Sequence, residues 1–146
     1  MIRYDELNLH VEFGKLLHVI SDHAREMYGG QSNLDVSHMS AAIAASIVRG
    51  YAVYKGDAIV GYALFMLSRD LFKAHIRTAE CVAVFINKAH RNGVVASRLL
   101  AFSSMRLEHE GVNQLIITAN NNERLANYYA RLGFKKCNIQ MVKEMQ

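Results

Sequence analysis

With 146 residues, the chain has the length of one domain that can bury a hydrophobic core of its own. Hydrophobic residues make up 51% and charged residues 21%, a balance that excludes an intrinsically disordered chain. The net charge of +4 comes from basic residues scattered along the sequence, which argues against a nucleic-acid-binding module because no clustered Arg/Lys face is present.

The sequence shows no sign of a membrane-spanning or exported protein. No apolar stretch approaches the ~18 residues that cross a bilayer, and the N-terminus turns acidic at Asp5-Glu6 instead of forming an apolar signal core. The two cysteines, Cys81 and Cys137, have no metal-type spacing and are expected to be free, buried thiols. We therefore expect a cytoplasmic protein. Because the chain contains no proline, no proline-rich linker divides it, and residues 1–146 are predicted to form a single domain.

The N-terminal third is predicted to be mainly helical. Apolar residues recur at helical spacing from residue 9 to residue 27, and Gly29 and Gly30 end that helix. A second helix is predicted over residues 36–48, with Gly50 as its stop. A short strand over residues 2–4 is left open before them.

Strands follow in the middle of the chain. Residues 51–55 and 58–67 are predicted to form two strands joined by a hairpin at Gly56-Asp57. Residues 78–86 are apolar on both faces, which indicates a central strand buried on both sides.

The C-terminal third alternates between helices and strands. The pattern predicts a helix over residues 93–109, a buried strand over 115–119, a helix that begins after Asn122 and stops at Gly133, and a last strand over 134–142. The order of elements is therefore α-α-β-β-β-α-β-α-β, which places the chain among the α/β proteins.

The junction between residues 86 and 100 has the pattern of a phosphate site. A buried strand that ends at Ile86 runs into a loop of small residues that opens a helix. The first N–H groups of a helix lack intrahelical partners and carry the positive end of its dipole, so they suit a phosphate group. Arg91 could add a charge-assisted contact, and Ala96 leaves room for close approach. The alternative is an ordinary strand-to-helix turn with a solvated arginine.

A second segment, residues 122–134, contains two adjacent tyrosines. Its apolar stripe consists of Leu125, Tyr128, Tyr129 and Leu132, and Gly133 supplies the C-cap. Adjacent helical residues point about 100° apart, so one tyrosine can pack while the other offers a functional hydroxyl. The alternative is that both tyrosines are core residues with satisfied hydroxyls.

Glu80 begins a strand that is otherwise apolar. A charge at this place must lie at the exposed end of the strand, be paired, or face a cavity. An ordinary end-of-strand charge and a catalytic carboxylate are therefore the two interpretations.

These segments occur in the order and spacing of one family. Over residues 50–135 the chain resembles the GNAT superfamily of acyl-CoA N-acyltransferases. The run Arg91-Asn92-Gly93-Val94-Val95-Ala96 is similar to the family's Arg/Gln-x-x-Gly-x-Gly/Ala loop. Asn122, Tyr129 and Gly133-Phe134 match its Asn…Tyr-x-x-x-Gly-Phe segment. The resemblance implies a mixed, mostly antiparallel central sheet with helices on both faces.

The same resemblance implies acetyl-CoA (coenzyme A) as the acyl donor and an amine as the acceptor. A backbone N–H group of the strand at residues 84–86 would polarise the thioester carbonyl, and the amides of the loop would hold the pyrophosphate. Tyr129 would protonate the departing thiolate, and Glu80 would act as the general base, directly or through water. The implied coenzyme-binding residues are Val84, Phe85, Ile86, Arg91, Asn92, Gly93, Val94, Val95, Ala96, Ser97, Asn122 and Tyr129.

Val94 replaces the first glycine of the family's loop pattern, and its β-branched side chain narrows backbone freedom. This departure favours an alternative of a different class, a non-catalytic domain of the same fold that binds coenzyme A or a partner without turnover. Glu80 and Tyr129 favour the enzyme.

The acceptor itself is not identified by the sequence. It is expected to bind at the two N-terminal helices and at the loop over residues 68–76, because the family uses that region. A homodimer is left open. No metal site is expected, because the seven histidines show no H-E-x-x-H spacing.

Overall fold

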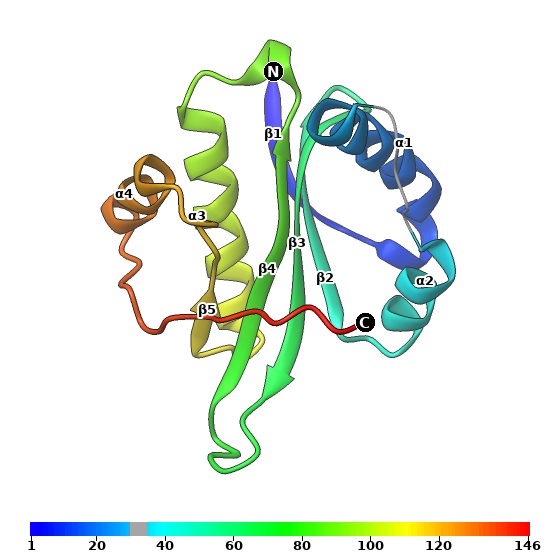
Figure 1. The fold of residues 1–146 in the computed structure, drawn as a ribbon. Coiled ribbons are helices and arrows are strands. Elements are labelled where there is room, and N and C mark those ends of the chain that lie inside the picture. The colour runs from blue at the N-terminus through cyan, green and yellow to red at the C-terminus, as the bar shows by residue number, and fades with distance from the viewer. Residues whose placement is uncertain (30–34) are drawn as a thin grey trace.

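The computed structural model describes residues 1–29 and 35–146 (Figure 1). In chain order the elements are β1 (Ile2–Leu7), α1 (Leu9–Tyr28), α2 (Val36–Ala44), β2 (Val48–Lys55), β3 (Ala58–Arg69), β4 (Arg77–Ile86), a short 3-10 helix (Lys88–His90), α3 (Val94–His109), β5 (Gln114–Ile116) and α4 (Glu123–Arg131). The predicted α/β class is confirmed. The strand left open over residues 2–4 is present as β1, and after it the predicted order of elements is correct except at the C-terminus.

The five strands form one sheet in the order β1-β2-β3-β4-β5. Neighbours among β1 to β4 are antiparallel, and β5 lies parallel to β4. The sheet is thus mixed and mostly antiparallel, as the family resemblance implied. β5 pairs with β4 only from Thr78↔Gln114 to Glu80↔Ile116, so beyond Glu80 the two strands part.

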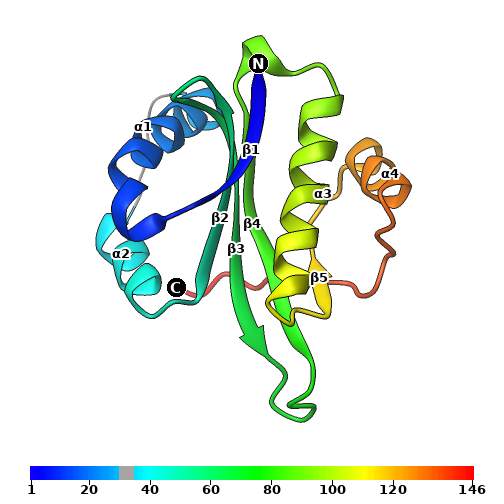
Figure 2. The same cartoon turned by 180° about the vertical axis from the view of Figure 1, so that it is seen from behind.

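Helices cover both faces of the sheet: α1 and α2 lie on one face, and α3 and α4 lie on the other (Figure 1, Figure 2). Successive side chains of a strand point to opposite faces, and they feed two hydrophobic clusters. One cluster packs against α3 and includes Tyr51, Phe65 and Leu99. The other packs against α1 and includes Leu16 and Tyr62. We call these two sides of the sheet the α3 face and the α1 face.

The ends of α1 and α2 follow from local backbone chemistry. Gly29 adopts the left-handed conformation (φ 68°), and its N–H group donates to the carbonyl of Arg25, which ends α1. Asp35 caps α2, because its side chain accepts from the N–H group of His38. α2 ends at Ala44 instead of residue 48, because the chain reverses at Ser46, where φ is 59°, and Val48 already belongs to β2.

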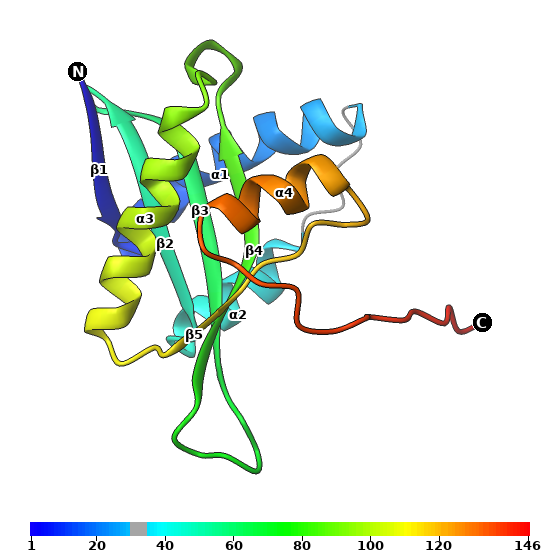
Figure 3. The ribbon, with the colours of Figure 1, turned by 90° about the vertical axis from the view of Figure 1, so that its left-hand side faces the viewer.

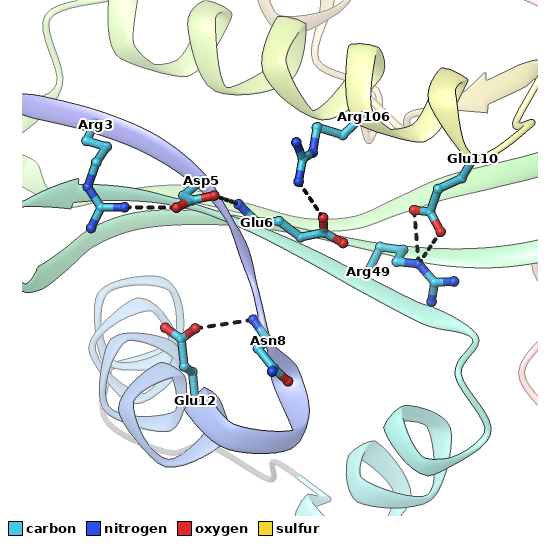
Figure 4. Close-up of polar contacts among 8 residues, drawn as sticks. All are labelled: Arg3, Asp5, Glu6, Asn8, Glu12, Arg49, Arg106 and Glu110. Carbon is cyan, nitrogen blue, oxygen red and sulfur yellow. Dashed lines mark hydrogen bonds and ion pairs between the residues drawn. The ribbon is translucent and has the colours of Figure 1, made fainter.

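The C-terminal end of α3 is tied to β1 and β2 by two ion pairs (Figure 4). Arg106 Nη2 lies 2.9 Å from Glu6 Oε2, and Arg49 Nε donates to both carboxylate oxygens of Glu110 at 3.0 and 3.1 Å. Both pairs are partly exposed to solvent, so each contributes little on its own. They join the C-terminal end of α3 to two neighbouring strands of the sheet.

The predicted last strand over residues 134–142 is wrong. Residues 134–146, all of them in the described part of the chain, form no strand and run away from the sheet as an exposed segment (Figure 3). The N–H group of Phe134 donates to the carbonyl of Tyr129, so it completes the end of α4. A segment with an apolar pattern becomes a strand only where a neighbouring strand can form backbone hydrogen bonds with it. β5, the strand at this edge of the sheet, is only three residues long.

Two further expectations concern the thiols and the membrane. Both cysteines are free, as predicted, but only Cys81 lies inside the fold. Cys137 is exposed, because it belongs to the segment that leaves the sheet. This corrects the expectation of two buried thiols.

Within residues 1–29 and 35–146, no helix is long and apolar enough to span a lipid bilayer.

Candidate active site

The sheet opens between β4 and β5, and this opening is the centre of the candidate site. β4 continues to Ile86, whereas its pairing with β5 ends at Glu80. The N–H group of Asn87 donates to the carbonyl of Val60 on β3 at 2.7 Å. Because backbone groups of an antiparallel pair point alternately toward and away from the partner strand, the N–H groups of Val84 and Ile86 point away from β3. Both are therefore placed to donate to a ligand in the opening.

Phe85 differs from its two neighbours. The carbonyl oxygen of Phe85 points toward β3, so that a Cβ atom added to Gly61 of β3 would lie only 2.9 Å from this oxygen. The ring of Phe85 is buried on the α1 face. Of the three strand residues implied to contact the coenzyme, Val84 and Ile86 present their backbone to the opening and Phe85 does not. The ring of Phe85 instead stacks on His23 of α1, with ring centroids 4.7 Å apart.

A β-bulge in β4 decides which side chains face the opening. The register with β3 passes from Phe65↔Cys81 to Leu64↔Ala83, so Val82 has no partner in β3, and it is 50% exposed. Because of this extra residue, Cys81 and Val84 both lie on the α3 face. The predicted burial of β4 on both sides holds at its C-terminal end and fails at Val82.

Glu80 and Tyr129 lie on opposite faces of β4. Glu80 is exposed and opposes Met66 in register, and it points to the α1 face because its neighbour Ala79 belongs to the α3-face cluster. Its carboxylate forms no hydrogen bond or ion pair with the residues that the structure describes. Tyr129, on α4, packs against the α3-face cluster beside Cys81. The opening therefore has a carboxylate on one side and a phenol on the other.

The two adjacent tyrosines of α4 have different surroundings. Burial is the main cause that raises the pKa of the Tyr129 hydroxyl, with smaller contributions from Cys81 and Tyr128. The Tyr129 hydroxyl is therefore protonated at neutral pH and can donate a proton. The hydroxyl of Tyr128 is buried and has no hydrogen-bond partner among the described residues. This buried, unpaired hydroxyl was not foreseen from the sequence.

A hollow of about 530 Å³ lies beside Tyr129, between β5 and α4. Tyr129 forms part of its wall, and the other lining residues include Leu115, Ile117 and Phe134. Most of the lining is apolar, which suits an uncharged part of a ligand, and Lys135 and Lys136 also belong to it.

A side chain of the loop before α3 occupies N–H groups at the start of that helix. Asn92 Oδ1 accepts from the N–H groups of Val94 and Val95 at 3.2 and 3.4 Å. Gly93 takes the left-handed conformation (φ 82°), so Val94 begins α3 with an ordinary helical backbone and a side chain that is 46% exposed. The left-handed residue of the loop is thus Gly93, one position before Val94, where the family pattern has its glycine.

Three other residues implied at the coenzyme site make contacts within the protein. Ala96 packs at the border of the α3-face cluster. The Ser97 hydroxyl donates to the carbonyl of Val94 at 2.9 Å. Asn122 caps α4, because its Oδ1 atom accepts from the N–H group of Leu125 at 3.0 Å.

Arg91 points toward α1, and this contact was not foreseen. Its Nη1 and Nη2 atoms donate to the two carboxylate oxygens of Glu26 at 2.5 and 2.6 Å, and its Nε atom donates to the carbonyl of Ile86 at 2.7 Å. The hydrogen bond from Arg91 is the main cause that lowers the pKa of Glu26. The guanidinium also lies 5.4 Å from the ring centroid of Phe85. Residues 65 positions apart carry no local sequence signal of such a pair.

His23 is the other residue that sequence reasoning missed. Its Nδ1 atom lies 2.6 Å from the hydroxyl of Tyr62, and burial is the main cause that lowers its pKa. Its helical spacing from the buried Leu16 and Ile20 is the one sequence signal that could have placed it against the sheet. No group of three His, Cys, Asp or Glu side chains in the described ranges is arranged to hold a metal ion.

Comparisons with known proteins agree with this architecture. The sequence model of the acetyltransferase (GNAT) family matches residues 16–134. A search among curated proteins gives no match. Among solved structures, the chain is similar to an aminoglycoside acetyltransferase from an uncultured soil metagenomic sample, with a TM-score of 0.80, 9% identity, and coverage of 99% of this chain and 97% of that one.

Two further structures are similar at comparable distance. One is a ribosomal-protein-alanine N-acetyltransferase from Brucella melitensis biovar Abortus 2308, with a TM-score of 0.77, 12% identity and full coverage (100%) of both chains. The other is a predicted acetyltransferase with acetyl-CoA from Clostridium acetobutylicum, with a TM-score of 0.75, 13% identity, and coverage of 99% and 96%. At these identities the likeness shows a shared fold.

Proposed function

Because the chain belongs to the acetyltransferase (GNAT) family, whose acyl donor is acetyl-CoA, we propose that it transfers an acetyl group from acetyl-CoA to a primary amine. One observation carries this proposal. β4 presents two N–H groups to the opening and an exposed carboxylate on the α1 face, and α4 brings a half-buried phenol to the α3 face.

The residues around the opening fit the coenzyme. The edge of β4 that faces the opening presents the backbone groups of Val84 and Ile86, which suit a chain of amide groups. The N-terminal end of α3 and the guanidinium of Arg91 offer N–H donors and positive charge to phosphates. Residues 91–97 and Asn122 complete the set that would hold the coenzyme.

Each catalytic group then has one task. Acetyl-CoA supplies the acetyl group in activated form, as a thioester. The N–H group of Val84 or Ile86 donates to the carbonyl oxygen and stabilises the negative charge that develops there. Glu80 takes a proton from the ammonium group, directly or through water, and so frees the lone pair that attacks. Tyr129 gives its hydroxyl proton to the sulfur as the C–S bond breaks, while the nitrogen gives up its second proton to water and Tyr129 regains a proton from solvent. The two proton transfers take place on opposite faces of β4.

The test begins with binding. Coenzyme A and acetyl-CoA should raise the melting temperature, because a ligand that binds only the folded state stabilises it by about 2.7 kcal/mol at a hundredfold excess over Kd. The absence of any shift at that concentration would contradict the proposal.

The second arm measures turnover as free thiol released in the presence of a panel of amines. Aminoglycosides and a peptide with N-terminal alanine come first, because two of the similar structures are named for such acceptors. We expect thiol release that depends on an acceptor. Binding without turnover on every amine would favour the alternative, a non-catalytic domain of this fold. The cytoplasmic location stays a prediction from the sequence.

A further inference from the structure

Several hydrogen-bond donors of the loop before α3 are already occupied within the protein. Arg91 uses its Nε, Nη1 and Nη2 atoms on the carbonyl of Ile86 and the carboxylate of Glu26. The N–H groups of Val94 and Val95 donate to Asn92 Oδ1. A phosphate group at this helix terminus would use the same donors. The carboxylate of Glu26 and the carboxamide oxygen of Asn92 therefore accept the hydrogen bonds for which phosphate oxygens would compete.

The contact between Glu26 and Arg91 joins two parts of the fold. Glu26 belongs to the C-terminal turns of α1, on the face where the acceptor is expected, whereas Arg91 belongs to the loop between β4 and α3. The Arg91 and Glu26 side chains are 40% and 37% exposed, so a ligand can reach the pair from solvent. The pair is bidentate but not buried, and a diphosphate carries more negative charge than one carboxylate, so it can displace Glu26 from Arg91.

We propose that Glu26 is a further residue of the coenzyme site, which holds Arg91 in the coenzyme-free protein and yields it to the coenzyme diphosphate. The proposal rests on the proposed function, because it requires a diphosphate at the loop. Glu26 acts through Arg91, so it is a positioning residue. By this exchange, coenzyme binding releases the end of α1 from the loop.

The charges around Glu26 allow the exchange. Arg91 contributes most to its low pKa through a direct hydrogen bond, and Lys88 and His23 contribute less. When Arg91 turns to a diphosphate, Lys88 remains as a positive neighbour of the carboxylate. Because Glu26 is partly exposed, it also gains water as a partner and is not left as a buried, unpaired charge.

The test is the affinity of the full chain for coenzyme A, measured by isothermal titration calorimetry. Glu26→Gln keeps the shape of the side chain and removes the competing charge, so Kd should fall about two- to fivefold. The matched control is Asp22→Asn on the same helix. Asp22 pairs with Arg25, not with Arg91, so this variant should change Kd by less than about 1.5-fold at physiological ionic strength.

A double-mutant cycle separates competition from other effects of Glu26. Arg91→Ala should weaken coenzyme binding, and Glu26→Gln should add nothing in that background, because the residue for which it competes is gone. Arg91→Gln, which keeps part of the side chain and removes the charge, replaces Arg91→Ala if the latter does not fold. Melting temperatures without ligand identify the folded variants.

The outcomes distinguish the two proposals. If the wild-type protein does not bind coenzyme A, the proposed function fails. If it binds, but Glu26→Gln binds equally well or more weakly, only the role of Glu26 is refuted. The same holds if the effect of Glu26→Gln persists without Arg91.

Discussion

At the scale of single residues, the positions of Glu80 and Tyr129 would separate the two proton transfers that we propose. Glu80 is exposed on the α1 face, whereas Tyr129 packs in an apolar setting on the α3 face. Groups with such different surroundings can serve as base and acid at the same pH. Because β4 lies between them, the proton that one accepts is not passed directly to the other.

Tyr129→Phe should slow turnover and leave the fold and the coenzyme affinity nearly unchanged, because only the proton donor is lost. General acid catalysis contributes roughly 10²–10⁴-fold, so kcat should fall by that order when chemistry limits the rate. The matched control is Tyr128→Phe, which removes a buried hydroxyl that lacks a hydrogen-bond partner among the described residues. That variant should keep its activity and its stability. Equal losses in both variants, measured under saturating acetyl-CoA, would reassign the acid.

Glu80→Gln should give a defect that depends on pH. The acceptor amine is mostly protonated at neutral pH and must lose a proton before it attacks. Without the carboxylate, kcat/KM should be lower near pH 7, and the deficit should shrink as the pH rises and free amine becomes abundant. A pH–rate profile of both proteins checks this. An identical profile would show that Glu80 is an ordinary end-of-strand charge.

At the scale of elements, the close approach of β3 to β4 positions the strand amides of the candidate site. A Cβ atom at Gly61 would lie 2.7 Å from Ile86 Cδ1 and 2.9 Å from the carbonyl oxygen of Phe85. The second neighbour is backbone, so it cannot yield unless β4 itself moves. Gly61 is therefore needed for close packing of the strands.

Gly61→Ala should destabilise the protein by about 1–3 kcal/mol, the usual cost of overpacking, and should also lower activity by displacing the end of β4. Gly14→Ala is the matched control, because a Cβ atom at Gly14, inside α1, meets nothing within 4 Å. It should stabilise α1 by up to about 1 kcal/mol. Urea denaturation with unchanged m-values measures both effects. Similar changes in the two variants would contradict the packing argument.

At the scale of the whole molecule, His23 connects α1 to the centre of the sheet. Its ring stacks on Phe85 of β4, and its Nδ1 atom contacts the hydroxyl of Tyr62 on β3. Burial favours the neutral imidazole and lowers the pKa of His23 from its ordinary value of 6.5, an effect that Glu26 opposes and Arg91 reinforces. The packing of this layer therefore depends on the protonation of one side chain.

The stability of the protein should accordingly fall as the pH is lowered. Below about pH 6.5 the unfolded chain binds a proton at His23 more readily than the folded chain does, so the free energy of unfolding decreases until the folded pKa is passed. His23→Gln should make this decrease shallower between about pH 7.5 and pH 5.5. His18→Gln, at an exposed position of the same helix, is the control. Equal pH dependence in wild type and His23→Gln, followed by urea denaturation, would exclude the linkage.

The sequence by itself determined the features that depend on near neighbours in the chain. The left-handed turn at Gly133, the central strand that ends at Ile86 and the helix that carries Tyr128 and Tyr129 all follow from spacing and glycine position. Such features are local, because side-chain periodicity fixes the faces of a helix or strand and glycine marks where it ends.

Only the tertiary structure decided how these parts meet. The early parting of β5 from β4, the bulge at Val82 and the pair between Glu26 and Arg91 each depend on segments distant in sequence. The segment after Phe134 has the pattern of a strand and does not become one, because strand formation requires a neighbour whose backbone is free to pair. The local sequence limits which secondary structure a segment can form, and contacts with distant parts of the chain decide whether it forms.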